Sequence, residues 1–262
     1  LADRRADIAD RFQNIYGQLD SLKAENEAGH LKTAIVGFGQ GLNFYTPEPT
    51  TDVQAAVNLV RSIKNDDSGR EYVFEAVGQV VKKWAKFRSY PNKHNCMVVI
   101  VTDERGDDFE KIETVAAYCS KHNFRVFTIG NASPFGREKG YVRYTYKDGF
   151  QDDIAVDQGP ESVKMEVVDL PFWGGRRVAS SRISSGQGPY ALTRLCAETG
   201  GLYLITQDTA GPNFDRFIMK EYMPDYRPIR KYIEDVNKSV TKQALIAAAE
   251  ATQKTRVIAP TL

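Results

Sequence analysis

The sequence predicts an α/β protein with a mostly parallel sheet flanked by helices. Short apolar runs rich in Val, Ile and Phe alternate along the chain with amphipathic stretches of about 12 to 18 residues. The run CMVVIVTD, residues 96–103, does not alternate between apolar and polar side chains. That pattern is typical of a parallel strand covered on both faces. Together these features indicate helical crossovers between neighbouring strands.

Each element is predicted from the spacing of its apolar residues. In residues 3–23 they recur at helical spacing, and Thr51 or Asp52 is a suitable N-cap for the second helix. The pair Gly200–Gly201 is a usual signal for the end of a helix. The expected order is helix 3–23, strand 32–39, helix 51–63, helix 71–87, strand 96–103, helix 108–123, strand 124–130, helix 188–201 and strand 202–208.

Two segments depart from this alternation. Residues 131–188 contain many Gly, Pro, Arg and Tyr residues and are expected to form a long irregular insertion, with a strand in 162–173 as one option. The Ala-rich tail is expected to be helical, with breaks at its prolines. The predicted domains are therefore an α/β domain over 1–210, which carries the insertion, and a C-terminal helical extension over 211–262.

Charge and cysteine usage argue against several classes of protein. With 35 Lys and Arg against 34 Asp and Glu, the chain has no net field that would attract nucleic acid or an anionic membrane. No apolar run approaches the roughly 18 residues needed to cross a bilayer, so no membrane span is expected. Cys96, Cys119 and Cys196 lie far apart, so no disulfide framework or zinc site is expected. The last two fall on apolar helix faces, which predicts buried thiols.

A glycine-rich segment follows the expected strand 32–39, as in a dinucleotide-binding loop. That loop needs a further glycine where this chain has Leu42, and a helix directly after it. Here NFYTPEPTT follows, with two prolines, so the segment predicts a strand end with a turn. The three histidines are scattered, and no serine-nucleophile, phosphate-loop or metalloprotease motif occurs.

A group of acidic side chains follows the expected strand 96–103: Asp103, Glu104, Asp107 and Asp108. Because sites in parallel sheets lie beyond the carboxyl ends of the strands, Asp103 is a better candidate than an arbitrary surface acid. It could hold a metal ion, or it could order the loop by accepting hydrogen bonds from backbone N–H groups. Asp107 and Asp108 precede a helix, where acids complement the helix dipole.

Four local patterns, in order, resemble the von Willebrand factor type A (vWA) domain family. They are TAIVGFG, SGREYVFEAV, VVIVTDERGDD and ALTRLCAETGGLYLI, and the resemblance covers residues 1 to about 207. It implies a three-layer, Rossmann-like vWA fold with a metal-ion-dependent adhesion site built from three loops. Oxygen ligands of that kind suit Mg²⁺, which keeps an open position for a carboxylate of the partner.

Only part of that metal site has counterparts in this chain. Asp103 stands where the family has its third-loop Asp, and Glu71 stands where the second loop has a Thr. The first-loop Asp-x-Ser-x-Ser motif is absent, since residue 1 already lies at the start of the first helix. We therefore expect an incomplete metal site at Asp103 and Glu71, with no cofactor in this chain and Mg²⁺ only in a longer parent chain. Glu71 could instead pair with Arg70 or Arg105.

The missing loop also implies a missing strand in the middle of the sheet. Its neighbours would leave backbone groups unpaired, at a cost of about 1–3 kcal/mol for each orphaned group. A native protein does not tolerate a row of these. The chain is therefore expected to be a fragment of a longer protein, or to fill the position from elsewhere. Residues 255–262 are one option, although Pro260 suits a sheet interior poorly.

The insertion is rich in Arg and aromatic side chains, which are the usual anchors of protein interfaces. Asp152 and Asp153 within it are adjacent and could bind a cation. The alternative is that the insertion packs as a lid, with Trp173 buried. The candidate partner-binding residues are Glu104, Arg105, Asp107, Arg137, Arg143, Trp173 and Arg176.

These features favour a non-catalytic protein-binding module that recognises a protein partner through its strand-end face. The alternative is a carboxylate- or metal-dependent hydrolase that uses Asp103 and Glu71, since paired carboxylates suffice for hydrolysis. Binding is favoured because the sequence offers no nucleophile–base pair. A third option is a scaffold whose C-terminal helices dock another subunit. The metal and hydrolase hypotheses require Asp103 to point into a cleft shared with Glu71.

Overall fold

The computed structural model describes residues 5–24, 31–64, 66–89, 91, 93–146, 148–168, 183–207 and 221–254. The chain forms two compact units, Leu1–Ala76 and Val77–Leu262. Trp173, Arg176 and residues 255–262, which the sequence singles out, lie outside the described residues. No helix in the described ranges has the length and apolar character needed to cross a membrane.

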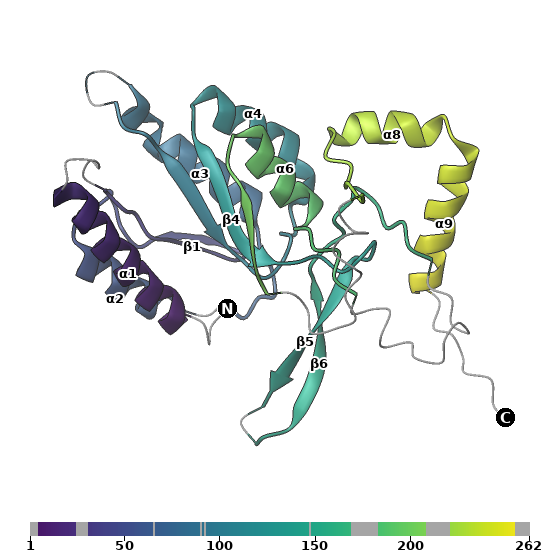
Figure 1. Ribbon diagram of the computed structural model, residues 1–262, viewed down its shortest axis with the longest axis horizontal. Coiled ribbons are helices and arrows are strands. Elements are labelled where there is room, and N and C mark those ends of the chain that lie inside the picture. The colour runs from purple at the N-terminus through teal and green to yellow at the C-terminus, as the bar shows by residue number, and fades with distance from the viewer. Residues whose placement is uncertain are drawn as a thin grey trace. The chain divides into compact units, whose positions relative to one another are not determined.

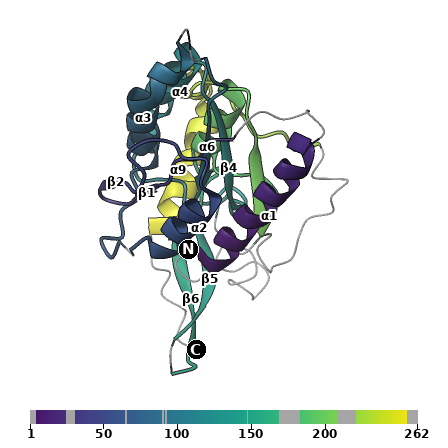
Figure 2. The same cartoon turned by 90° about the vertical axis from the view of Figure 1, so that its left-hand side faces the viewer.

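The first unit contains two helices that pack side by side, α1 (Arg5–Ala24) and α2 (Val53–Ser62), as Figure 2 shows. Both helices were expected from their apolar spacing. Of the two candidate N-caps for α2, the structure selects Asp52 over Thr51. The Asp52 carboxylate accepts a hydrogen bond from the Ala55 N–H at 2.9 Å, which satisfies one of the unpaired donors at the helix start.

A small apolar core joins the two helices of the first unit. Alanines at the contact allow α1 and α2 to approach closely, and valines on one face of α2 fill the space between them. The buried side chains of this core are Ala9, Ile35, Ala56, Val57 and Val60. At the surface, Arg61 pairs with Asp10 at 2.7 Å, a contact that adds little stability because both side chains are well exposed.

The strand predicted over 32–39 is short, and it lies in an antiparallel pair. β1 (Val36–Phe38) pairs with β2 (Leu42–Phe44), and the Gly39 N–H closes the turn by donating to the Gly41 carbonyl at 3.0 Å. The glycine-rich segment is therefore a hairpin turn, which confirms the predicted strand end with a turn. A second strand follows it in place of the helix that a dinucleotide site requires.

The helix predicted over 71–87 is observed as α3 (Val73–Trp84), followed by the short 3₁₀ helix η2 (Ala85–Arg88). Val77 and Val81 are buried one turn apart, as expected for an amphipathic helix. The boundary between the two compact units falls within α3.

The second unit contains a three-stranded parallel sheet in the order β3-β4-β7 (Figure 1). The strands are β3 (Met97–Val101), β4 (Arg125–Asn131) and β7 (Tyr203–Gln207). The helices α4 (Ile112–Lys121) and α6 (Tyr190–Glu198) pack on each other and against β4. The short 3₁₀ helix η3 (Phe109–Lys111) precedes α4. A mixed α/β fold with a parallel sheet and flanking helices is thus confirmed.

One face of this parallel sheet is buried and the other is partly exposed. Thr128 is fully buried and its hydroxyl lies 3.3 Å from the Cys196 thiol of α6, so this face lies under the helices. On the other face, Met97 is 55% exposed and Val99 is 43% exposed. In the described residues, α4 and α6 pack together on one side of the sheet, so the prediction that β3 is covered on both faces is not confirmed.

The outer edge of β3 has no ladder partner in the described part of the chain, since β3 pairs with β4 alone. The strand β1 likewise pairs with β2 alone within those residues. The strand that the vWA resemblance places beside β3 therefore stays a prediction.

Residues 131–188, predicted to be irregular, contain a regular β-hairpin. β5 (Lys139–Thr145) and β6 (Gln151–Asp157) pair antiparallel along their whole length. In the turn, the Tyr146 N–H donates to the Phe150 carbonyl at 2.8 Å. Gly149 sits in this turn at φ +85°, which favours glycine. Figures 1 and 2 both show the hairpin extending away from the carboxyl end of β4.

Residues 221–254, the described part of the predicted C-terminal extension, contain two helices. They are α8 (Ile229–Asn237) and α9 (Val240–Lys254), which contact each other. Pro228 is the N-cap of α8, in agreement with the predicted helix break at the prolines. The strand considered for 162–173 is absent from residues 162–168, the described part of that segment.

Candidate functional site

The loop after β3 is held close to the end of the strand by hydrogen bonds of the Thr102 hydroxyl. The Glu104 N–H donates to the Thr102 hydroxyl at 3.1 Å, and that hydroxyl lies 3.1 Å from the Glu104 carbonyl, to which it donates. Asp103 and Glu104 are half-buried, whereas Asp107 is exposed. Asp108 is buried and its side chain makes no capping bond to the turn that follows. The loop therefore presents only part of its acidic cluster to solvent.

The sequence predicts an incomplete metal site at Glu71 and Asp103. Glu71 lies two residues before α3, in the first unit, and Asp103 lies in the second, so their pairing stays a prediction. Among the described residues, no three His, Cys, Asp or Glu side chains gather where they could hold a metal ion.

Arg105 ties the loop after β3 to the base of the hairpin. Its guanidinium pairs with Glu138 at 2.5 Å and with Asp157 at 2.9 Å, and its backbone N–H donates to the Asp157 carbonyl at 3.0 Å. The same guanidinium lies 4.3 Å from the centroid of the Phe109 ring. We name Arg105, Glu138 and Asp157 the Arg105 clamp. Because the arginine is mostly buried, its pairs are screened less than surface pairs.

Asp157 gives the Arg105 clamp a pH dependence. Burial raises the pKa of Asp157 to about 6, against the opposing attraction of Arg105. The ordinary value is 3.8, so between these two pH values the folded protein binds a proton that the unfolded chain does not. The contribution of Asp157 to the free energy of unfolding therefore falls as the pH rises through this window.

Replacing Asp157 by asparagine is expected to remove this slope. From about pH 4 to about pH 6, the unchanged protein should lose about 2 kcal/mol of unfolding free energy relative to the variant. Urea unfolding at the two pH values measures the difference. Asp152→Asn, the same change at an exposed position of β6, is the control and should track the unchanged protein. The raised pKa of Asp157 would be contradicted if the unfolding free energies of the Asp157 variant and the unchanged protein change with pH in parallel.

One face of the hairpin carries a row of exposed apolar side chains. We name Tyr144, Tyr146, Phe150 and Ile154 the apolar strip; their exposed fractions lie between 39% and 62%. The Tyr144 and Tyr146 rings meet edge to face with centroids 5.0 Å apart, and Phe150 continues the row 5.9 Å from Tyr146. Because adjacent rings support one another, the strip is a more rigid surface than separate exposed side chains would be.

The opposite face of the hairpin is more polar, although it also carries Tyr141, which is 41% exposed. Arg143 of β5 and Asp153 of β6 stand directly opposite each other and pair at 3.2 Å. The cation site suggested for Asp152 and Asp153 is not compatible with this geometry, because successive side chains of a strand point to opposite faces. Asp152 instead stands opposite Tyr144, on the face of the apolar strip.

The segment that anchors the hairpin is held by buried polar contacts. Glu161 is fully buried, accepts the Gly136 N–H at 2.9 Å, and accepts the Tyr222 hydroxyl at 2.8 Å. Burial raises the pKa of Glu161, and these two donors oppose the shift. Arg137, a candidate for partner binding, is only 6% exposed. Its side chain therefore lies mostly within this interior, and its role in partner binding stays a prediction.

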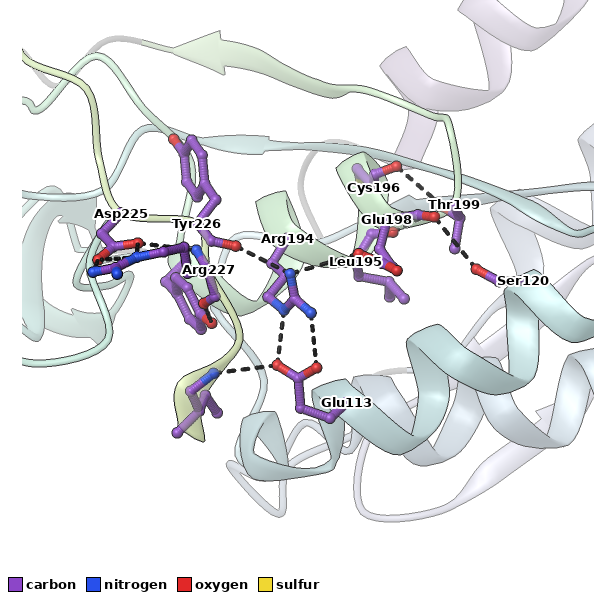
Figure 3. Close-up of polar contacts among 12 residues, drawn as sticks. Glu113, Ser120, Arg194, Leu195, Cys196, Glu198, Thr199, Asp225, Tyr226 and Arg227 are labelled. Atoms are coloured by element: carbon purple, nitrogen blue, oxygen red, sulfur yellow. Dashed lines mark hydrogen bonds and ion pairs between the residues drawn. The ribbon is translucent and has the colours of Figure 1, made fainter. Parts of the chain in front are cut away.

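A second arginine, Arg194, connects the C-terminal segment with the helices α4 and α6 that flank the sheet (Figure 3). Arg194 of α6 makes two parallel bonds of 2.8 Å to Glu113 of α4, and also donates to the Tyr226 carbonyl at 3.0 Å. Glu113 in turn accepts the Ile229 N–H at 3.3 Å. The hydrogen bond from Arg194 holds the pKa of Glu113 below its usual value. We name Arg194 and Glu113 the Arg194 clamp.

The predicted partner-binding residues fall into five groups in the structure. Arg143 and Asp107 are exposed, and Glu104 is half-buried. Arg105 is committed to its clamp. Arg137 is buried, and the two C-terminal candidates of the insertion lie outside the described residues. The exposed candidates Arg143 and Asp107 therefore lie on the hairpin and in the loop beside its base.

Phe150 and Ile154 complete the apolar strip, and the sequence did not point to either residue. A signal for their hairpin is present: the dipeptide Asp148–Gly149 separates two runs of strand-forming residues, and this arrangement is typical of a hairpin. Once the hairpin is assigned, its register places both residues on the face of Tyr144.

No family model matches the chain, and no curated protein sequence matches it. Among solved structures, the chain is similar to the conserved hypothetical protein BatB from Bacteroides thetaiotaomicron, with 13% identity, a TM-score of 0.39, and coverage of 82% of this chain and 83% of that one. It is also similar to an uncharacterized membrane spanning protein from Vibrio fischeri, with 14% identity, a TM-score of 0.23, and coverage of 87% and 83%. Neither similarity decides the family at such low TM-scores, and the vWA resemblance stays a prediction.

Proposed function

We propose that this protein is a non-catalytic protein-binding module whose partner contacts the β5–β6 hairpin at the strand-end face. The observation that carries the proposal is the apolar strip, in which four large apolar side chains stand exposed in one row. Exposed apolar groups that lie together mark interaction surfaces, and aromatic side chains supply most of the energy in many interfaces.

The contacts that hold the base of the hairpin in place support a binding role. The Arg105 clamp and the buried contacts of Glu161 hold its base in one position. A surface that is ordered before binding loses less conformational entropy when the partner arrives. The base of the hairpin also lies next to the loop after β3, because the Arg105 N–H donates to the Asp157 carbonyl.

The charge of the hairpin favours protein over nucleic acid as the partner. Residues 139–157 contain three cationic and four acidic side chains. A hairpin without excess positive charge gains no net benefit from the counterion release that drives proteins to bind phosphate backbones. The proposal uses no metal ion and no catalytic group.

A double substitution in the strip tests the proposal. Tyr146→Ser with Phe150→Ser should weaken capture of native partners by roughly tenfold or more, because it removes two adjacent rings. The measurement is quantitative mass spectrometry of proteins retained from the native host by the immobilised, purified chain. The matched control is Thr145→Ser with Gln151→Ser, at the same level of the hairpin on its polar face.

The control should retain the same partners as the unchanged protein, and thermal unfolding should show that both variants remain folded. Capture that survives the loss of both rings would contradict the proposal. So would the absence of any retained partner with the unchanged chain.

A further inference from the structure

One acidic side chain lies within the apolar strip. Asp152 and Tyr144 stand directly opposite each other in the β5–β6 ladder, so their side chains share one face and their Cβ atoms are about 5 Å apart. Both residues are exposed. Of the strand residues that the register assigns to this face, Asp152 is the charged one.

The Asp152 carboxylate is oriented by a backbone hydrogen bond. Its Oδ1 accepts the Asp153 N–H at 2.8 Å, which restricts how the side chain can turn. The nearby arginines are engaged elsewhere: Arg143 pairs with Asp153 on the opposite face, and Arg105 pairs with Asp157. Across the ranges that the structure describes, no cationic side chain forms an ion pair with Asp152.

A carboxylate beside exposed aromatic rings suits one kind of ligand. A guanidinium can stack on a tyrosine ring and pair with a neighbouring carboxylate at the same time, because it is planar and weakly hydrated. The carbon stem of the arginine would lie along the apolar strip. An anionic or purely apolar ligand would leave the carboxylate without compensation when the strip is covered.

We propose that the apolar strip binds an arginine-bearing segment of the partner protein, with the guanidinium over Tyr144 and paired with Asp152. This inference rests on the proposed function, since it names the chemistry of the partner at the same surface. It predicts that binding weakens with salt, because both groups are exposed and their attraction is screened.

The probe is N-acetyl-arginine methylamide, titrated into the full chain while the backbone amide resonances of the hairpin are followed by NMR. The comparison ligand is the citrulline analogue, which keeps the shape and loses the charge. The arginine probe should bind at millimolar concentration, about fivefold more tightly than the citrulline analogue, and shift the amides of Tyr144 and Asp152. Asp152→Asn should remove that fivefold preference.

Asp148→Asn is the matched control, because it removes an equal charge from the turn of the same hairpin while an asparagine can still accept the Phe150 N–H. This control should keep the preference for arginine. Equal affinity for the two ligands, no binding of either, or a preference that survives Asp152→Asn would overturn the inference. The capture experiment with Tyr146→Ser and Phe150→Ser judges the proposed function separately, since it depends on the rings and not on Asp152.

Discussion

Replacing Arg194 by methionine is expected to lower the free energy of unfolding by about 3 kcal/mol. Arg194 is 9% exposed and holds the Glu113 carboxylate with two hydrogen bonds and the Tyr226 carbonyl with a third. Methionine fills much of the space but removes the hydrogen bonds that Arg194 donates to both acceptors. The effect should stay at the lower end of the range for buried pairs, because Glu113 is 41% exposed and partly regains water.

Urea unfolding of the full chain at neutral pH measures this loss, and amide exchange at Ile229 reports whether the C-terminal segment detaches. Arg230→Met is the matched control. Arg230 is 90% exposed and pairs with Glu234 of its own helix within the described residues, so its loss should cost less than about 0.5 kcal/mol. Equal losses in the two variants would show that the Arg194 clamp contributes no more than a surface pair.

The same clamp should weaken in acid. The pKa of Glu113 is lowered in the folded protein relative to its ordinary value of 4.5. Its stabilising contribution is therefore present above that value and is lost as the pH falls through the folded-state pKa. This direction is opposite to that of Asp157, whose raised pKa favours the folded protein as the pH falls.

Replacing Gly201 by alanine is expected to destabilise the protein by about 3 kcal/mol. A Cβ on Gly201 would lie 1.8 Å from the Val126 carbonyl oxygen and 2.6 Å from its carbon. Both are backbone atoms of β4, so no side chain can rotate away to make room. The neighbouring ladder bond, from the Thr128 N–H to the Leu202 carbonyl at 3.0 Å, would have to shift with them.

The adjacent glycine provides the comparison. Gly200 has φ +74°, and a Cβ there would meet no atom within 4 Å. Gly200→Ala should therefore cost only the backbone strain of the left-handed conformation, about 1 kcal/mol. Thermal unfolding of the two variants shows which substitution lowers the melting temperature more. If Gly200→Ala lowers the melting temperature as much as Gly201→Ala does, or more, the steric explanation is contradicted.

The elements that the sequence predicted correctly have signals within a few residues of themselves. Asp52 at an N-cap, the Ala-rich stretch of α9, and Gly200 after α6 each act through contacts along one turn of chain. The parallel pairing of β3 and β4 was also predictable, because a helix of sufficient length connects two apolar runs.

The hairpin was predicted wrongly as irregular structure. Its Asp148–Gly149 turn signal lies in a segment whose many Gly, Arg and Tyr residues favour loops by composition. Cross-strand pairing overrides that preference, since each strand supplies the hydrogen bonds that the other needs. Arg137 also departs from the usual pattern: arginine is usually exposed, but here packing within the insertion buries it.

The candidate site was only partly predictable for the same reason. Composition placed Arg143 and Tyr144 in an interface-forming segment, and the structure shows both exposed on the hairpin. Which face each occupies follows from the strand register, and the sequence alone did not indicate the turn that sets it. The metal pair Glu71 and Asp103 stays a prediction, because the two residues belong to different compact units.

The sequence by itself determined where helices and strands form, because periodicity and capping act over a few neighbouring residues. Only the tertiary structure decided which distant groups meet: Arg194 and Glu113 lie 81 positions apart, and Arg105 reaches Glu138 across 33. Such pairs depend on where the chain reverses and on how helices pack. A local pattern carries no record of either, so the surface proposed for binding became visible only in the folded chain.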